Sequence, residues 1–292
     1  MNKEYSLSYV LSTYNKFPFV QVTLPYLINA CKEDEEIVVV DGGSTDGTAA
    51  YLQQLFEEGK IHQFISEKDH GEGHGYNKSF LKTRGELIKV VSDDDAYYFE
   101  GIEQCKKFML GHPEIEVLGA DGFAVNNSLQ KNEFSQRYDI ERFKKWQGNK
   151  KPFIFCGLSM MFRRDALPVI GLVNNNFIIT DFEYTLRITS GKAKIAWYTG
   201  LVYVNIINAQ SNSGTQWRRM EMEREKLEQL YFNKRILIPF QTKDKVKNIF
   251  RPLKKKLFPQ KMIEPVNYFE IYQQSMQYLI EGNKGIKHEY LY

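Results

Sequence analysis

The stretch Glu86-Leu-Ile-Lys-Val-Val-Ser-Asp93-Asp94-Asp95 joins a short apolar run to three consecutive carboxylates. The run from Leu87 to Val91 predicts a buried strand. Three adjacent negative charges repel one another and are not buried without partners. Carboxylate oxygens at a strand end suit a divalent cation such as Mg2+ or Mn2+. An isolated acidic triplet also fits a solvated turn, so the surrounding fold must decide between the two interpretations.

Apolar periodicity on both sides of this stretch alternates between strands and helices. In the first half we expect strands at 6–11, 36–40, 61–66 and 87–91, and helices at 19–31, 48–56, 76–83 and 100–110. In the less regular second half, strand-like runs cover 115–125, 153–162 and 193–206, and helices cover 181–190 and 217–236. Strands that alternate with helices of this length predict an α/β fold with a mostly parallel, doubly wound sheet.

The four expected strands of the first half all end in polar residues. These ends are Ser12-Thr-Tyr-Asn15, Asp41-Gly-Gly-Ser44, Glu67-Lys-Asp-His70 and Ser92-Asp-Asp-Asp95. In an open α/β sheet, ligands bind outside the carboxyl ends of the strands. A fold that brings the four polar ends to one edge therefore predicts a combined metal and nucleotide site.

Two loops have competing interpretations. The loop Gly71-Glu-Gly73-His-Gly75 does not match GxGxxG and follows the third expected strand, which argues against a Rossmann cofactor site. The segment Asp41-Gly-Gly-Ser-Thr-Asp46-Gly fits a turn with a helix cap. A cap needs Ser44 and Asp46, but it leaves the Asp41 carboxylate available to a nucleobase or a ribose.

The segment Thr180-Asp181-Phe-Glu183 has the spacing of a helix capping box. On that interpretation Asp181 only complements the helix dipole. A carboxylate at a helix start that faces a cleft also suits a general base that takes a proton from a hydroxyl. His70 and His74 lack an HxH or HExxH pairing, so they predict no zinc site.

The composition is typical of a soluble globular protein, with 42% hydrophobic and 26% charged residues in a chain of 292. The net charge of +3 is too small to predict nucleic-acid binding. Three cysteines without a CxxC motif suggest a reducing compartment. The sequence shows neither a signal-peptide pattern nor an apolar run of membrane-spanning length. We therefore expect a cytoplasmic protein.

The segment 243–261 contains eight Lys or Arg residues and one acidic residue. Its apolar residues recur at helical spacing, although Pro252 is expected to kink the helix. Such a basic amphipathic helix suits an anionic membrane surface, here the inner membrane face. A solvated helix packed on the domain is the alternative. Basic and aromatic residues are not interleaved in a recognised module, which argues against nucleic acid as a partner.

These residues together resemble the family-2 glycosyltransferases, which have the nucleotide-diphospho-sugar fold called GT-A, and in particular bacterial enzymes that build surface polysaccharides. The resemblance runs from about residue 6 to residue 215. Its motifs come in the family's order: Ser12-Thr-Tyr-Asn15, Ile37-Val-Val-Val-Asp41-Gly-Gly-Ser-Thr-Asp-Gly-Thr48, Asp69-His-Gly71 with Tyr76-Asn-Lys78, Gly85-Glu-Leu-Ile with Ser92-Asp-Asp-Asp95, and Asp181-Phe-Glu-Tyr-Thr-Leu-Arg187.

The resemblance implies roles for individual residues. Those it places at the nucleotide sugar are Thr13, Tyr14, Asn15, Asp41, Asp69, Gly71, Asn77, Lys78 and Asp93. Thr13 and Asp41 would contact the uracil and the ribose. Asp94 falls on the metal-binding carboxylate, with Asp95 as a second metal candidate, and Asp181 falls on the catalytic base.

Three positions depart from the family pattern. Ser92 stands where many members have the first Asp of a DxD motif, and Thr180 stands where many have Glu before the catalytic Asp. Ser12 replaces a common Pro. Metal binding would therefore rest on fewer carboxylates.

The implied activity is that of an inverting glycosyltransferase that uses Mg2+ or Mn2+. It would move a sugar from a nucleotide sugar, a UDP-sugar first of all, to a hydroxyl of a saccharide or lipid-linked acceptor. Ser92 and Thr180 motivate an alternative, a catalytically inactive glycosyltransferase-like subunit of a polysaccharide assembly complex. A nucleotidyltransferase on a related fold would need a Gly-rich loop with Arg and Lys after the first strand, which is missing.

We expect two units along the chain. Residues 1–215 would form the GT-A domain, with a nucleotide-binding half at 1–98 and an acceptor-binding half at 99–215. Residues 216–292 would form a helical C-terminal extension that is basic at 243–261.

Overall fold

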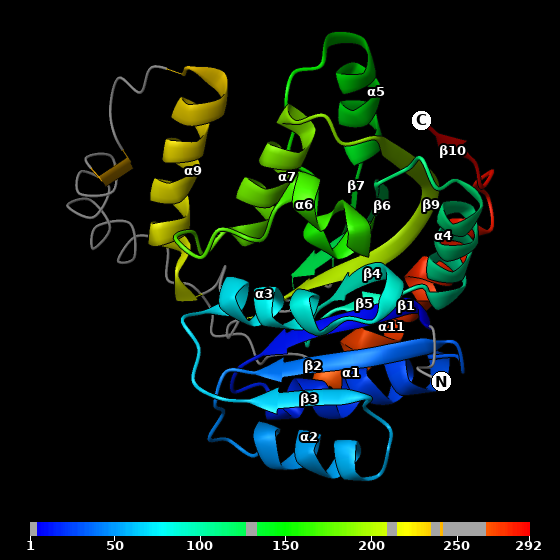
Figure 1. Ribbon diagram of the computed structural model, residues 1–292, viewed down its shortest axis with the longest axis vertical. Coiled ribbons are helices and arrows are strands. Elements are labelled where there is room, and N and C mark those ends of the chain that lie inside the picture. Colours follow the sequence, from blue (N-terminus) through cyan, green and yellow to red (C-terminus); the bar gives the residue numbers. More distant parts are fainter. Residues whose placement is uncertain (1–4, 127–132, 209–214, 235–239, 242–266) are drawn as a thin grey trace, which may run out of the picture.

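One mixed sheet forms the centre of the molecule, with helices on both of its faces (Figure 1). The computed structural model describes residues 5–126, 133–208, 215–234, 240–241 and 267–292. The strand order is β10-β9-β6-β8-β4-β1-β2-β3, with β5 and β7 paired to β9 and β6. The predicted basic segment 243–261 lies outside the described residues. In the part of the chain that the structure describes, no helix has both the length and the apolarity to cross a membrane.

The first half of the chain alternates strands and helices, as predicted. Its elements are β1 Tyr5–Thr13, α1 Phe17–Ala30, β2 Glu35–Asp41, α2 Thr48–Glu57, β3 Gln63–Ser66, α3 Glu72–Lys82, β4 Gly85–Val91, β5 Ala96–Tyr97 and α4 Phe99–Gly111. Strands β4, β1, β2 and β3 pair in parallel, so their carboxyl ends meet at one edge. Most residues of β1, β2 and β4 are buried, which explains continuous apolar runs such as residues 37–40.

The second half extends the same sheet with mixed pairing. Its elements are β6 Val117–Asn126, β7 Phe134–Arg137, α5 Asp139–Asn149, β8 Met161–Arg163, α6 Leu167–Ile170, α7 Thr180–Ser190, β9 Ile195–Ile207, α9 Trp217–Phe232, α11 Tyr268–Asn283 and β10 Tyr290–Leu291. Strand β8 runs antiparallel between β4 and β6, whereas β6 and β9 are parallel. The predicted fold class, an α/β protein with a mostly parallel central sheet and C-terminal helices, is confirmed.

Two of the predicted elements have the wrong extent. Most of the expected strand 153–162 is irregular, because Phe153 and Phe155 pack around Trp197 and do not join the ladder. Helix α3 begins at Glu72 and not at 76, so the Gly-rich loop is its first turn. A Cβ atom at Gly75 would collide with the Ser12 hydroxyl, so glycine lets this turn approach the end of β1.

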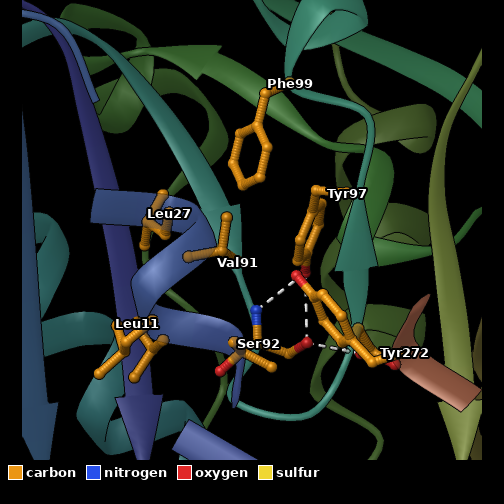
Figure 2. Close-up of a pocket in the computed structure, with 10 residues that line it drawn as sticks. Leu11, Leu27, Val91, Ser92, Tyr97, Phe99 and Tyr272 are labelled. Carbon is orange, nitrogen blue, oxygen red and sulfur yellow. Dashed lines mark hydrogen bonds between the residues drawn. The ribbon is translucent and has the colours of Figure 1, made fainter. Parts of the chain in front are cut away.

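The chain leaves β4 through a residue that is tied to β5 (Figure 2). The backbone N–H of Ser92 donates to the Tyr97 hydroxyl at 2.8 Å, and the Ser92 hydroxyl lies 3.2 Å from the same oxygen. Behind this link, apolar side chains that include Leu11, Leu27 and Phe99 line a small void. The hydrogen bonds fix where the acidic residues leave the edge of the sheet.

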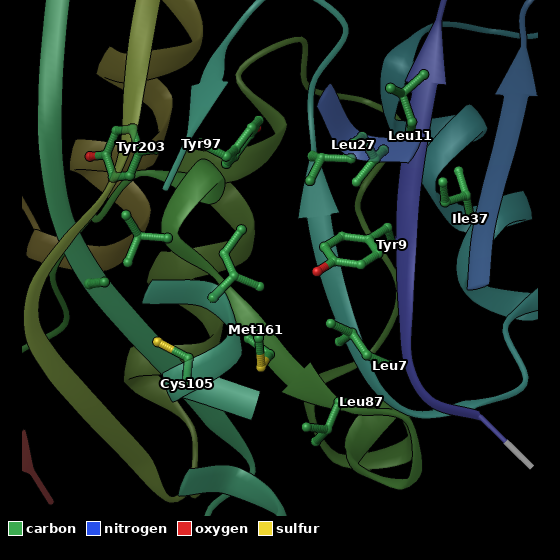
Figure 3. Packing of buried hydrophobic residues seen from close by; sticks show 14 of the residues in the cluster. Leu7, Tyr9, Leu11, Leu27, Ile37, Leu87, Tyr97, Cys105, Met161 and Tyr203 are labelled. Atoms are coloured by element: carbon green, nitrogen blue, oxygen red, sulfur yellow. The ribbon is translucent and has the colours of Figure 1, made fainter. Parts of the chain in front are cut away.

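Side chains of β1 alternate between two hydrophobic cores. Leu7, Tyr9 and Leu11 belong to the core on the face that is covered by α1, α2 and α4 (Figure 3). Val10 belongs to the core on the face covered by α3, α5 and α7. This alternation is the side-chain period of a strand in a doubly wound sheet. The two cores hold the sheet edge rigid, so the residues that follow β1 and β4 start from fixed positions.

The C-terminal residues pack on the far end of the sheet. Helix α11 covers β9 and β5 through a third core that includes Ile271, Tyr272 and Leu279. Asn283, at its last turn, donates to the Leu201 carbonyl at 2.9 Å and accepts from the Leu201 N–H at 3.0 Å. Its amide therefore pairs with backbone groups of β9 close to the point where the β6–β9 register shifts.

Replacing Asn283 with Leu is expected to lower the free energy of unfolding by about 2–4 kcal/mol, because both backbone groups of Leu201 lose a buried partner. Urea denaturation followed by circular dichroism measures the change. The matched control Lys284→Met alters an exposed neighbour and should stay within about 0.5 kcal/mol. A loss for Asn283→Leu no larger than that of the control would contradict the role of the amide.

Candidate active site

A cleft of about 750 Å³ opens at the carboxyl ends of β1 and β4 and reaches α7 and α9. From the first half, its walls include residues 12–16, Asp69, Gly71 and residues 92–95. From the second half they include Arg137, residues 156–158, residues 178–182, Asn205, Met220 and Arg224. We call residues 92–95 the acidic turn. The two halves of the chain thus face each other across one cleft.

Lys16 supplies the positive charge in the acidic turn. Its Nζ lies 2.5 Å from Asp94 Oδ2 and 3.8 Å from Asp93 Oδ1, and only 14% of its side chain is exposed. Burial lowers the pKa of Lys16, but Asp93 and Asp94 raise it by more. Burial and the Asp94 charge raise the pKa of Asp93, while Lys16 and Thr13 pull it down. Lys16 is therefore a counter-ion that the protein itself supplies to the acidic turn.

Asp95 fastens the turn to β9. Its Oδ1 accepts hydrogen bonds from the Ile206 N–H at 2.6 Å and the Asn205 side chain at 3.2 Å, and its Oδ2 accepts from the Ser92 hydroxyl at 2.5 Å. Burial and Asp94 raise the pKa of Asp95. Both oxygens of Asp95 thus accept hydrogen bonds within the protein, whereas only Oδ2 of Asp94 does so among the described residues.

Asp94 presents one oxygen that suits a metal ion. Its Oδ2 accepts from Lys16 and from Asn208 at 3.0 Å, whereas its Oδ1 accepts no hydrogen bond from the described residues. Within the described ranges, no group of three or more carboxylate, imidazole or thiol side chains could hold a metal ion by itself. A cation held by one or two carboxylates and by substrate phosphates needs no such group. The acidic turn therefore fits a cation of that kind.

Asp181 lies on the opposite wall, as the second residue of α7. Its Oδ2 is 3.4 Å from the backbone nitrogen of Gly157, and a Cβ atom at Gly157 would lie 2.9 Å from the Cβ of Asp181. Glycine at position 157 is therefore needed for this close approach. Burial raises the pKa of Asp181, although the Gly157 N–H and Arg137 act in the opposite direction.

The predicted capping box is not formed. Thr180 is the first residue inside α7, the cap position belongs to Ile179, and no side chain caps the helix. Glu183 instead pairs with Arg187 at 3.0 Å. The capping-box prediction is therefore wrong. Asp181 and Glu183 do lie in the first turn of α7, where they complement the helix dipole, and the carboxylate of Asp181 also lines the cleft.

The residues predicted to contact the nucleotide fall into two groups. Thr13, Tyr14, Asn15, Asp69, Gly71 and Asp93 line the cleft. Tyr14 stands at its mouth, with 57% of its surface exposed. Asn15 has a left-handed backbone, with φ of 51°, and its side chain accepts from the Thr45 N–H at 2.9 Å. This bond holds the loop after β1 against the loop after β2.

Asp41, Asn77 and Lys78 do not line the cleft. Asp41 is fully buried and accepts hydrogen bonds from Gly43, Ser44 and Ser66. Asn77 exchanges hydrogen bonds with the backbone of Val173, and Lys78 pairs with Glu67 at 2.7 Å. These side chains order the loops that border the cleft.

Glu223 of α9 holds the backbone just before Asp181. Its Oε2 accepts from the N–H groups of Ile178 at 2.7 Å and Ile179 at 3.2 Å, and its Oε1 accepts from Arg219 at 2.9 Å. Neither Glu223 nor Lys16 was predicted from the sequence. Glu223 lies in a highly charged helix, and the periodicity of that helix does not distinguish a buried glutamate from a solvent-exposed one.

Replacing Lys16 with Met is expected to lower the free energy of unfolding by about 2 kcal/mol at pH 8, because two partly buried carboxylates lose their counter-ion. The raised pKa of Asp93 means that the folded state favours its protonated form, so the loss should shrink at pH 5. Urea denaturation in EDTA at both pH values measures this.

The control Lys32→Met removes an exposed pair with Glu103 and should change stability by less than about 1 kcal/mol at either pH. If Lys16→Met destabilised the chain equally at pH 5 and pH 8, the counter-ion role would be wrong.

Known proteins share the sequence and the fold of this chain. The model of glycosyl transferase family 2 matches residues 8–170. A relative named "Putative teichuronic acid biosynthesis glycosyltransferase TuaG" from Bacillus subtilis is 26% identical over 105 residues, 36% of this chain and 42% of that protein. The poly-beta-1,6-N-acetyl-D-glucosamine synthase of Staphylococcus epidermidis is 23% identical over 62% of this chain and 45% of its own length. The chain thus spans less than half the length of these relatives.

Solved structures show the same fold at low identity. TarS 1–349 of S. aureus in complex with UDP-GlcNAc aligns with a TM-score of 0.55 at 14% identity, covering 95% of this chain and 81% of that 1–349 chain. The mannosyltransferase PcManGT of Pyrobaculum calidifontis, with GDP-Man and Mn2+, aligns with a TM-score of 0.56 at 15% identity, covering 96% and 76%. The family model covers more than half of the chain, and on that ground the chain belongs to glycosyl transferase family 2.

Proposed function

We propose that this chain transfers a sugar from a nucleoside diphosphate sugar to a hydroxyl group of a saccharide or lipid-linked saccharide, with inversion at the anomeric carbon. One observation carries the proposal. The acidic turn and Asp181 line opposite walls of the same cleft, so a donor and an acceptor could meet between them. The reaction would serve the synthesis of a bacterial surface polysaccharide.

The nature of the donor is supported by the names of related proteins. TarS was solved with UDP-GlcNAc and PcManGT with GDP-Man and Mn2+. The names of TuaG and of the N-acetylglucosamine polymer synthase refer to teichuronic acid and to an amino-sugar polymer. We propose a UDP-sugar as the first candidate donor for this chain. The cleft residues after β1, together with Asp69, Gly71 and Asp93, would surround the nucleotide.

Asp94 is the residue that we propose to hold Mg2+ or Mn2+. Its Oδ1 accepts no hydrogen bond from the described residues, whereas the oxygens of Asp95, the second predicted ligand, already accept three hydrogen bonds. A bound cation would neutralise the charge of the leaving diphosphate. Lys16 lies on the other oxygen of Asp94, so it is close enough to share that task.

Asp181 is the proposed general base. Its ionised carboxylate would take the proton of the acceptor hydroxyl as that oxygen attacks the anomeric carbon. The bond from the anomeric carbon to the diphosphate breaks at the same time, and the nucleoside diphosphate leaves with the electron pair. Attack from the face opposite the diphosphate inverts the configuration. Gly157 and Glu223 would keep the base in place from two sides.

The unit proposed to carry this activity is residues 1–215, with residues 216–292 as an extension. Contacts from α9 and α11 join that extension to the cleft and to the sheet. Membrane attachment through 243–261, on the cytoplasmic side, remains a separate proposal, since those residues lie outside the described part of the chain.

Replacing Asp181 with Asn is expected to slow sugar transfer by about 10²–10⁴-fold, because the amide does not take a proton. Affinity for UDP should stay within about twofold. Because burial raises the pKa of Asp181, we expect kcat/KM of the wild type to fall on the acid side at a pH above the ordinary range of an aspartate. Release of UDP from a panel of UDP-sugars and saccharide acceptors measures the rate.

The control Asp165→Asn alters an exposed carboxylate outside the cleft and should keep full activity. Near-normal turnover of Asp181→Asn would eliminate it as the base. A wild-type chain that binds UDP but transfers no sugar from any donor would instead support the inactive-subunit alternative.

Replacing Asp94 with Ala is expected to weaken UDP binding in Mn2+ by about tenfold or more, and to change it little in EDTA, because the variant lacks the proposed metal oxygen. Titration calorimetry with UDP in both buffers measures the difference. Thermal unfolding of the variant checks that it remains folded. Equal affinities of the variant and the wild type in Mn2+ would contradict the assignment.

A further inference from the structure

Arg137 is a cleft-lining cation that the proposed chemistry does not use. It ends β7, is half-buried, and pairs through that strand with Gly122 of β6. Its Nη2 donates to the Asn205 side-chain oxygen at 3.2 Å. Among the described residues, no carboxylate lies within ion-pair distance of its guanidinium, and Asn205 is its one side-chain acceptor.

The Arg137 guanidinium has no anionic partner among the described residues. It carries five N–H donors in a planar fork that fits a carboxylate or a phosphate. Desolvating a charge is costly unless it is paired and hydrogen-bonded, and one neutral amide oxygen satisfies only one donor. Its remaining donors have no acceptor among the described residues, so they suit an anionic group that enters the cleft.

The surroundings of Arg137 belong to the acceptor side of the cleft. Burial has the largest effect on the pKa of Arg137 and lowers it. Cys156, Tyr203, Asp139 and Asp181 raise that pKa, and the net change is upward. Asp139 already pairs with Arg142 at 3.1 Å. The acidic turn has its own cation in Lys16. Lys16 contacts the carboxylates of the acidic turn directly, whereas Arg137 reaches that turn only through Asn205 and lines the same cleft as Asp181.

We propose that Arg137 binds an anionic group of the acceptor, a carboxylate or a phosphate, next to the hydroxyl that receives the sugar. The acceptor would then be an acidic saccharide or a phosphorylated one. This inference rests on the proposed function, since it takes Asp181 as the base of the reaction. Asn205 would orient the guanidinium, because its oxygen accepts from Arg137 while its NH2 group donates to Asp95.

The test compares three probes against the chain saturated with UDP, so that the donor site is filled. Methyl β-glucuronide and glucose 6-phosphate carry the two candidate anions, and methyl β-glucoside is neutral. Saturation-transfer NMR and calorimetry measure the dissociation constants for the wild type, Arg137→Gln and the control Arg164→Gln. Arg164 also donates to a single neutral acceptor, the Gly85 carbonyl, but lies outside the cleft lining.

The wild type and Arg164→Gln should bind one or both acidic probes at least about tenfold more tightly than the glucoside. Arg137→Gln should lose that preference while its thermal unfolding temperature and UDP affinity stay close to those of the wild type. Which probe is preferred separates a carboxylate from a phosphate on the acceptor.

Three results would overturn the inference. The first is an Arg137→Gln variant that keeps the preference for acidic probes, since Arg137 would then not bind the anion. If the wild type binds the acidic probes no more tightly than the glucoside, the cleft has no anion site of the proposed kind. In the third result, the Arg137→Gln variant loses as much affinity for UDP as for the acidic probes. Arg137 would then bind the diphosphate of the donor and not an anionic group of the acceptor. Failure of the wild type to bind UDP at all would instead count against the proposed function, so the two failures are distinguishable.

Discussion

Three adjacent carboxylates at the end of β4 impose the electrostatic constraint on which the cleft depends. Their mutual repulsion is balanced in different ways. Lys16, which precedes α1, lies against Asp94 and near Asp93, while Asp95 accepts hydrogen bonds from β9 and from Ser92. The balance therefore draws together the ends of β1, β4 and β9, which come from both halves of the chain. These contacts position the acidic turn on one wall of the cleft.

The opposite wall is built by packing rather than by charge balance. Asp181 reaches the cleft because Gly157 has no side chain in its way and because Glu223 pairs with the backbone before α7. Burial raises the pKa of Asp181, so its carboxylate has a higher proton affinity than a solvated one. The two walls thus differ in chemistry. One holds three carboxylates beside Lys16, and the other holds a single carboxylate packed against the backbone of Gly157.

The sequence was a good guide to the first half of the fold and to the edge of the sheet. The strands there are continuous apolar runs that end in polar residues, and parallel pairing brings those ends together. The sequence was a poor guide to partners. Lys16 and Asp94 are 78 residues apart, and no local pattern links them. Likewise, the buried aromatic residues Phe153 and Phe155 alternate as in a strand, but they pack around Trp197 from an irregular segment of chain.

The contact of Glu223 with the backbone of Ile178 and Ile179 has a consequence for recombination among family members. The family model ends at residue 170, before α7 and α9 begin. A chimera joined at that boundary would take α7 and α9 from the same parent and keep their contact intact. A chimera joined between these helices would take the backbone before α7 from one parent and the glutamate of α9 that binds it from the other. Helices α7 and α9 should therefore be exchanged together, although Glu223 is 45 residues from Ile178 and 44 residues from Ile179 along the chain.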